Sequence, residues 1–333
     1  MNGRQLNTNN HNLRDAEEVR GGVSVNKIGV LLPSEQEVAL FTVPAKGGKA
    51  TQLTTAYTCM PVWAPDGRHI YFDGCHAGKL ARLEYVASEG GKINRIPFLP
   101  ENLSPSFPSD IAISNDSSTL LFAGFYRYGE SKPEGSIFTV PVEGGMVTPL
   151  RIDNAEKIHS VGSPKWSPDE NRVAFIAAEK IKPGLSVYNI FVVPADGGEA
   201  KSISSQEDHV ARGTIDWSPD GKLIAFYGDN ALRVISSDGD MSRILVSDVG
   251  GGIPWAGIAW SPDGKQVAYT AGGDLHVVSR DGGQPKIIKT DLDARHLKID
   301  WSRDGKNIAF TASRGGDPEL WLMENFLPEA LGK

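Results

Sequence analysis

The chain contains the stretch Trp217-Ser218-Pro219-Asp220-Gly221-Lys222-Leu223-Ile224-Ala225-Phe226. Proline presets φ near −65° at the second position of a tight turn, aspartate bonds nearby backbone N–H groups, and glycine supplies a positive φ. The apolar, β-branched and aromatic run that follows is typical of a strand. We therefore predict a strand A, a tight turn and a strand B, with Trp217 filling the space between two twisted sheets.

The same stretch recurs in one frame along the chain. The further copies are Trp63-Ala64-Pro65-Asp66-Gly67, Ile113-Ser114-Asn115-Asp116-Ser117, Trp166-Ser167-Pro168-Asp169, Trp260-Ser261-Pro262-Asp263-Gly264 and Trp301-Ser302-Arg303-Asp304-Gly305. A second repeat interleaves with the first, as in Phe41 to Gly48 and Phe191 to Gly198, and its Gly-Gly pair indicates a hairpin between strands C and D. Four antiparallel strands per unit of about 40–55 residues are typical of a β-propeller.

We predict an all-β chain that forms one closed β-propeller of four-stranded antiparallel blades. Strand A–B hairpins occur six times, but strand C patterns occur seven times, from Leu40-Phe41 to Leu320-Trp321-Leu322, which favours seven blades over six. The expected blades cover residues 19–55, 56–98, 105–150, 159–203, 210–245, 254–289 and 297–324. Residues 1–18 form an N-terminal segment whose strand near residues 4–8 closes the ring, and 325–333 form a tail; a six-bladed ring with a frayed N-terminus is the alternative.

Composition limits the class of protein. Of the 333 residues, 40% are hydrophobic and 23% are charged, which is an ordinary balance for a globular protein. The net charge of −7 argues against a general nucleic-acid binder, whose affinity depends on Lys and Arg at phosphates. No run of 18 apolar residues predicts a membrane span. The polar residues Met1 to Gln5 lack the apolar core of a secretory signal. As written, the chain is expected in the cytoplasm; removal of a signal peptide would place it in the periplasm or outside the cell.

The repeated Trp-Ser-Pro-Asp-Gly units, with the Ile-Ala-Phe type of strand behind them, resemble the propeller of the TolB family over about residues 23–324. The resemblance implies the fold but not one function, because similar repeats occur in TolB proteins, in propeller domains of prolyl-oligopeptidase-like enzymes and in oligogalacturonate lyases. TolB proteins carry an α/β domain ahead of the propeller, and only about 20 residues precede the first predicted blade here. This difference puts a role as an actual TolB in doubt.

One face of the predicted ring carries the longer loops. The A–B and C–D turns lie on one face and are uniform, whereas the B–C and D–A connections vary in length. Loops of varied length on a rigid scaffold are where binding sites usually lie. Arginine and histidine in these loops could hold a carboxylate or a phosphate. The candidate ligand-binding residues are Tyr57, Arg127, His159, His209, Arg212, Trp255, Arg295 and His296.

Sequence motifs for catalysis are absent. The chain has no Gly-x-Ser-x-Gly elbow, no His-Glu-x-x-His and no paired Cys-x-x-Cys. We therefore assign no catalytic residue, and we predict no cofactor and no metal. The alternative is an enzyme that acts on acidic sugars: the resemblance to oligogalacturonate lyases implies a divalent metal above the channel, which His159, His209 and His296 could hold, with Arg212 or Arg295 as the base.

The expected function is a non-catalytic scaffold that binds a protein or peptide partner, or a small anionic or sugar ligand, through the face with long loops. A metal-dependent polysaccharide lyase or hydrolase is the alternative, and a propeller that gates a separate enzyme is a third hypothesis. A closed ring has no free sheet edge to force pairing, which favours a monomer. The two cysteines, Cys59 and Cys75, are expected opposite each other on strands that flank Pro65-Asp66-Gly67, as a disulfide or as two thiols.

Overall fold

The computed structural model describes residues 4–6, 27–32, 37–55, 58–74, 82–97, 103–105, 111–126, 136–182, 184–250, 256–314 and 319–324. These residues form β-strands and turns, with two short 3-10 turns, η2 (Ala155–Lys157) and η3 (Gln206–Asp208). Within them, no helix has the length and apolar composition needed to cross a membrane. The strands fall into two compact units, one of residues 38–313 and one of the chain ends.

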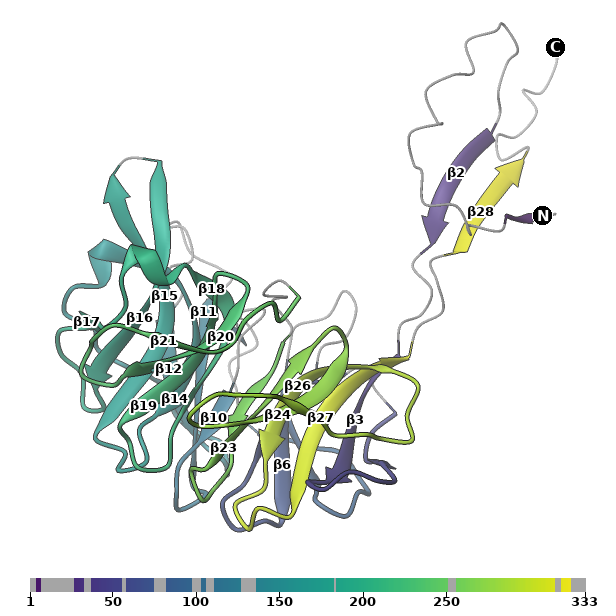
Figure 1. The fold of residues 1–333 in the computed structure, drawn as a ribbon, viewed down its shortest axis with the longest axis horizontal. Helices are drawn as coiled ribbons and strands as arrows, with labels where there is room; N and C mark the ends of the chain where they lie inside the picture. Colours follow the sequence, from purple (N-terminus) through teal and green to yellow (C-terminus); the bar gives the residue numbers. More distant parts are fainter. Residues whose placement is uncertain are drawn as a thin grey trace, which may run out of the picture. The chain divides into compact units, whose positions relative to one another are not determined.

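The larger unit contains six four-stranded antiparallel blades in its described residues, and Figure 1 shows their strands. Blade 1 consists of β5 (Cys59–Trp63), β6 (His69–Gly74), β7 (Arg82–Ala87) and β8 (Asn94–Arg95). Blade 2 consists of β10 (Ile111–Ile113), β11 (Thr119–Tyr126), β12 (Ser136–Pro141) and β13 (Thr148–Pro149), and β9 (Leu103–Pro105) also pairs with β11. Blade 3 consists of β14 (Ile158–Trp166), β15 (Arg172–Lys182), β16 (Leu185–Pro194) and β17 (Lys201–Ser202).

The other three blades repeat the same order of strands. Blade 4 consists of β18 (Val210–Trp217), β19 (Leu223–Gly228), β20 (Ala231–Ser236) and β21 (Arg243–Val246). Blade 5 consists of β22 (Ile258–Trp260), β23 (Gln266–Ala271), β24 (Asp274–Ser279) and β25 (Lys286–Ile287). Blade 6 consists of β26 (Arg295–Trp301), β27 (Asn307–Arg314), β3 (Glu37–Pro44) and β4 (Thr51–Gln52).

The blades form a closed ring because each packs against two neighbours. Every innermost strand contacts the innermost strand of the blade on either side, and β26 of blade 6 contacts β5 of blade 1. Six apolar clusters fill the interfaces, one between each pair of adjacent blades. The hydrophobic core of the described ring therefore consists of six separate clusters, one at each interface between blades.

Burial on both faces explains the sequence of the B strands. In β19, Ile224, Ala225, Phe226 and Tyr227 are all buried in succession, although side chains alternate between the faces of a strand. A strand covered on both sides needs such a continuous apolar run, whereas a half-exposed strand alternates with polar residues. Phe226 packs against blade 3, and Ala225 packs against blade 5. The predicted A–B–C–D order is confirmed in each blade.

The seven-blade prediction was wrong, because the first strand C does not form a blade with the strand that precedes it. Strand β3 pairs instead with β27, so an A–B hairpin from one end of the sequence joins a C–D hairpin from the other. Phe41 stacks on Phe310 with ring centroids 5.6 Å apart, and both are almost completely buried. The number of blades therefore equals the six A–B turns. Closure of the ring by residues 4–8 is not confirmed.

The chain ends form a separate three-stranded sheet, in the order β1 (Arg4–Leu6), β28 (Glu319–Glu324) and β2 (Lys27–Leu32). Gln5 pairs with Trp321, and Val30 pairs with Trp321 on its other side, both antiparallel. The sequence predicted that residues 4–8 would lie beside the strand at Leu320-Trp321-Leu322. The pairing is present in this sheet, but the sheet belongs to the smaller unit and not to a blade of the ring.

Two local predictions also need correction. Trp63 pairs with Ile70, and a register shift follows between Val62 and Cys59, so Cys59 lies opposite Asp73 and not opposite Cys75, which is outside the described residues. The connection between strands B and C of blade 3 belongs to the face where longer loops are expected, but β15 and β16 stay paired up to Lys182 and Leu185. This hairpin is longer than the six-residue strands of blade 4 and extends beyond them (Figure 1).

Candidate functional site

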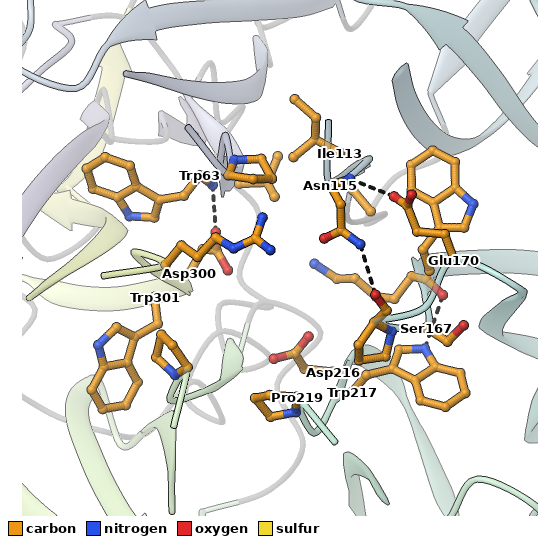
Figure 2. A pocket seen from close by; sticks show the side chains of 18 residues that line it. Trp63, Ile113, Asn115, Ser167, Glu170, Asp216, Trp217, Pro219, Asp300 and Trp301 are labelled. Atoms are coloured by element: carbon orange, nitrogen blue, oxygen red, sulfur yellow. Dashed lines mark hydrogen bonds between the residues drawn. The ribbon is translucent and has the colours of Figure 1, made fainter. Parts of the chain in front are cut away.

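The innermost strands surround a pocket of about 460 Å³ at the end of the ring where the A–B turns lie; we call this end the turn mouth (Figure 2). Its rim is built from one equivalent position of each blade, the third residue of the Trp-Ser-Pro-Asp-Gly repeat. Those six residues are Pro65, Asn115, Pro168, Pro219, Pro262 and Arg303. Four blades thus present a proline ring to the pocket, and two present a polar side chain.

Hydrogen bonds inside each turn hold the rim in place. In blade 4, the Ser218 hydroxyl donates to Asp220 Oδ1 at 2.6 Å, and the N–H of Lys222 donates to the same oxygen at 3.2 Å. Gly221 has a φ of 69°, where a side chain would be strained. The serine hydroxyl, as the largest cause, lowers the pKa of Asp220 below its ordinary value. The predicted role of this aspartate, bonding of backbone within the turn, is confirmed.

In three blades the residue just before the tryptophan is charged and bonds an adjacent blade at the wall of the pocket. In blade 6 this residue is Asp300, whose Oδ2 accepts the backbone N–H of Trp63 in blade 1 at 2.6 Å (Figure 2). In blade 4 it is Asp216, whose Oδ2 accepts the N–H of Trp260 in blade 5 at 2.7 Å. In blade 3 it is Lys165, whose Nζ donates to the carbonyl of Ile111 at 3.4 Å. These charged side chains link adjacent blades and also line the pocket.

The carboxyl of Asp300, which lines the pocket, has a pKa well above its ordinary value. Its desolvation in the ring raises its pKa from 3.8 to about 7, and the charge of Asp216 adds to the rise. The ammonium of Lys165 and the N–H of Trp63 oppose it. Near neutral pH both the protonated and the ionised forms of Asp300 are therefore populated. An acid with a raised pKa in a pocket is a feature that functional sites often share with structural networks.

Glu170 joins two turns across the rim. It occupies the glycine position of the blade 3 turn with a φ of 58°, a left-handed conformation that is unfavourable for a residue with a side chain. Its Oε1 accepts the backbone N–H of Asn115 at 2.6 Å, and Asn115 Nδ2 donates to the Pro168 carbonyl at 2.9 Å (Figure 2). The two copies of the repeat that lack the turn glycine are thus adjacent and bonded to each other.

Further along the innermost strands, three positions before the tryptophan, buried polar groups bond from blade to blade. Lys298 Nζ of blade 6 donates to Thr214 Oγ1 of blade 4, across an intervening blade, and Thr214 Oγ1 donates to the Ala256 carbonyl at 3.1 Å. Ser163 of blade 3 donates to the Gly213 carbonyl. Lys298, Thr214 and Ser163 are at most 3% exposed. Water does not reach their side chains.

Five of the eight residues predicted to bind a ligand are described, and they lie at the opposite end of the innermost strands. His159 is on β14 and Arg212 is on β18. The exposed His209, which has a φ of 46°, directly precedes β18. Arg295 begins β26 and packs over Gly273. His296 follows Arg295 on the same strand, and the structure describes its backbone only.

Three of the predicted residues, Tyr57, Arg127 and Trp255, lie outside the described residues. The ligand-binding role of the whole set therefore stays a prediction. In the described part of the chain, no three His, Cys, Asp or Glu side chains gather where they could hold a metal ion. A divalent-metal site of the kind implied by the lyase resemblance is thus not formed by the side chains that the structure describes.

Sequence reasoning missed the turn mouth because it treated the repeated turns as uniform. Six polar residues of the pocket are departures: each stands at a position of the repeat whose residue is not the same in all six blades. Those departures are Asn115, Lys165, Glu170, Asp216, Asp300 and Arg303. Aligning the six copies and asking which positions break the pattern would have found them, because residues needed only for folding recur in every blade.

Comparisons with known proteins agree with the ring at the level of the fold. No protein-family model and no curated protein matches the sequence. Among solved structures, a TolB-type protein from Agrobacterium tumefaciens is 16% identical, with a TM-score of 0.63, and covers 85% of this chain and 100% of its own. By fold, the ring is a TolB-like propeller.

Other propellers share the same fold. An oligogalacturonate lyase in complex with manganese is 15% identical, with a TM-score of 0.55, and covers 92% of this chain and 97% of its own. A chain from a nidogen/laminin complex is 10% identical, with a TM-score of 0.58, and covers 79% of this chain and 97% of its own. Likeness at such low identity extends to the fold alone, since propellers carry many unrelated functions.

Proposed function

We propose that this TolB-like propeller is a non-catalytic binding module that receives a segment of a partner protein in the turn mouth. The proposal rests on one observation: polar residues at positions that differ between the copies of the repeat lie together in one pocket. Asn115, Asp216, Asp300 and Arg303 come from three different blades, yet all of them line it. Charged groups gathered at one site of an otherwise regular ring are costly to place together unless they serve a function.

The shape of the pocket suits a segment that enters end-on. The proline rings of the rim are rigid and apolar, so they give contact area at little cost in conformational entropy. Inside the rim, Asp300 and Lys165 offer both signs of charge to a polar chain. Lys298 and Thr214 are buried further along the innermost strands, and their bond limits how far a segment could enter. A role in binding also agrees with the structural neighbours, which include a TolB-type protein and a chain from a protein–protein complex.

A substitution that fills the mouth tests this proposal. Pro219 is a suitable position because Arg303 and Asn115 occupy the equivalent place in other blades, so this turn accommodates a large side chain there. We expect Pro219→Trp to lower the affinity for proteins captured by the wild type at least tenfold. The measurement is quantitative mass spectrometry of captured proteins, followed by calorimetry with each purified candidate.

The control is Lys222→Trp, an exposed position in the same turn that does not line the pocket. It should bind as the wild type does, and thermal melts should show that both variants fold. Equal binding by Pro219→Trp and the wild type would contradict a site in the turn mouth. In that case the opposite end of the innermost strands, with His159, Arg212 and Arg295, becomes the place to mutate next.

The second candidate function is a carbohydrate-active enzyme whose site lies on the face with the long loops. The manganese-bound oligogalacturonate lyase covers nearly all of its own length in the comparison. His159 adds a specific observation: its Nδ1 is buried, and no described residue forms a hydrogen bond with it. Metal analysis of the purified protein, with thermal shift against Mn²⁺ and acidic oligosaccharides, tests this function. Stoichiometric metal or stabilisation by an acidic sugar would favour the enzyme, because a ligand that binds the native state raises its stability.

A further inference from the structure

We infer that the turn mouth recognises an acidic peptide, with a carboxylate of the peptide bound by the guanidinium of Arg303. This inference rests on the proposed function and specifies the chemistry of the segment that enters the pocket. It starts from the position of Arg303 in the repeat. Four of the six equivalent positions are proline, which the turn prefers, so arginine at the rim is not explained by the turn itself.

Arg303 is exposed, and its guanidinium forms no ion pair or hydrogen bond with any described residue. Two other arginines of the ring show the contrast. Arg172 pairs with Asp238 at 3.0 Å and lies over the Trp217 ring. Arg280 pairs with Asp220 at 3.4 Å and lies over the Trp260 ring. Those arginines stabilise the ring, whereas Arg303 presents its five N–H donors to the pocket and to solvent.

The acids that line the pocket are already engaged with backbone groups. Glu170, Asp216 and Asp300 each accept a backbone N–H, at 2.6, 2.7 and 2.6 Å respectively. A carboxylate that accepts a hydrogen bond from the main chain has part of its charge compensated locally. In addition, Asp300 is protonated in part near neutral pH because of its raised pKa. The acids therefore oppose a bound anion less than three isolated carboxylates would.

A second cation lies across the ring. Lys165 belongs to blade 3 and Arg303 to blade 6, and in a ring of six these blades face each other. Both side chains line the same pocket. A carboxylate that entered along the axis would thus have a guanidinium at the rim and an ammonium on the opposite wall. A planar guanidinium can bind a carboxylate through two parallel hydrogen bonds, which gives direction as well as affinity.

Three synthetic decapeptides of one length provide the probes: (Gly-Glu)₅, (Gly-Gln)₅ and (Gly-Lys)₅, each with an amidated C-terminus. Binding to the full chain is followed by the fluorescence of the pocket tryptophans and by calorimetry. We expect (Gly-Glu)₅ to bind at least tenfold more tightly than (Gly-Gln)₅, and Arg303→Ala to remove that difference. Affinity should also fall with added salt, because an exposed charge pair is screened.

Arg68→Ala is the matched control, since Arg68 is an exposed arginine in the blade 1 turn that does not line the pocket. It should leave the preference for (Gly-Glu)₅ unchanged. A version of (Gly-Gln)₅ with a free C-terminus separates the two sources of carboxylate: binding that equals (Gly-Glu)₅ would assign the C-terminal group, and binding that equals the amidated form would assign acidic side chains.

The inference is overturned if (Gly-Glu)₅ does not bind, if it binds no better than (Gly-Gln)₅, or if Arg303→Ala keeps the preference. These outcomes differ from failure of the proposed function. If Pro219→Trp abolishes partner capture while the acidic peptide shows no preference, the turn mouth is the binding site but its ligand is not acidic. If Pro219→Trp has no effect on either the partner or the peptide, both proposals fall together.

Discussion

Some single residues of this ring both join adjacent blades and line the pocket. Asp300 is the example: one oxygen accepts the N–H of Trp63 and so joins blade 6 to blade 1, while the same carboxyl lines the pocket. Its raised pKa has a consequence for stability. An acid whose pKa is higher in the folded state binds a proton more tightly there than in the unfolded chain. The protonated carboxyl therefore favours folding, and its ionisation opposes it.

The first prediction concerns pH. The contribution of Asp300 is fully present below its unfolded pKa of 3.8 and is lost as the pH rises to about 7. We expect Asp300→Asn to be more stable than the wild type at pH 8 and to differ less at pH 5, because an amide oxygen can still accept the Trp63 N–H. Each kcal/mol would raise Tm by about 1–2 °C in a chain of this size.

The measurement is Tm by calorimetry at pH 5, 6.5 and 8. Asp229→Asn is the control, because Asp229 is exposed in a two-residue turn with a φ of 50°, a conformation that asparagine adopts readily. It should follow the wild type at every pH. A gain for Asp300→Asn that is the same at pH 5 and pH 8 would show that the carboxyl does not titrate in this range.

At the scale of elements, the A–B turn is a self-contained unit with a small set of bonds. In five blades a serine hydroxyl donates to the turn aspartate at 2.5–2.7 Å. In blade 1 that position is Ala64, and Asp66 keeps only its bond from the Arg68 N–H, at 2.8 Å. Ala64 is as buried as the serines of the other turns. The site therefore has the space and the acceptor for the missing hydroxyl.

The second prediction follows from this comparison. We expect Ala64→Ser to raise the free energy of unfolding by about 1 kcal/mol, the usual net value of one hydrogen bond. Chemical denaturation measures the change. The gain should disappear when Asp66 is also replaced by Ala, and this double-mutant cycle isolates the new bond. Ala64→Ser that stabilises equally with and without Asp66 would mean that the hydroxyl bonds elsewhere.

At the scale of the molecule, stability depends on how the ring closes. Blade 6 is the only blade of the described ring whose two hairpins come from distant parts of the chain. Leu40 and Phe41, on β3, are buried in the interfaces with blades 1 and 5 respectively. Loss of β3 would expose both interfaces and leave the outer edge of β27 without its partner. The closing strand is therefore essential, although it lies far in sequence from the blade that it completes.

The third prediction tests this closure with two fragments. Residues 37–314 contain all six blades, so this fragment should unfold cooperatively with a Tm close to that of the full chain. Residues 58–314 lack β3 and β4, and this fragment should be strongly destabilised or aggregate, because it presents an open sheet edge and uncovered apolar side chains. Calorimetry and size-exclusion chromatography measure both. Equal stability of the two fragments would contradict closure by β3.

Local sequence determined most of the blade. Proline, aspartate and glycine impose their turn on the backbone within five residues, and a run such as Ile224 to Tyr227 has the composition of a strand buried on both faces. Because these preferences act over short distances, six similar stretches predict six similar hairpins. The A–B–C–D order, the bonds of Asp220 and the placement of Trp217 between blades could all be predicted in this way.

Only the tertiary structure decided the number of blades and the place of the pocket. Strand β3 has two candidate partners with similar apolar patterns, and the choice depends on whether the whole ring can close, which no local pattern records. The same closure brings Lys165, Asp216, Asp300 and Arg303 together, although up to 138 positions separate them in the sequence. Their proximity, and with it the raised pKa of Asp300, arises from the circular arrangement of the blades and not from their spacing along the chain.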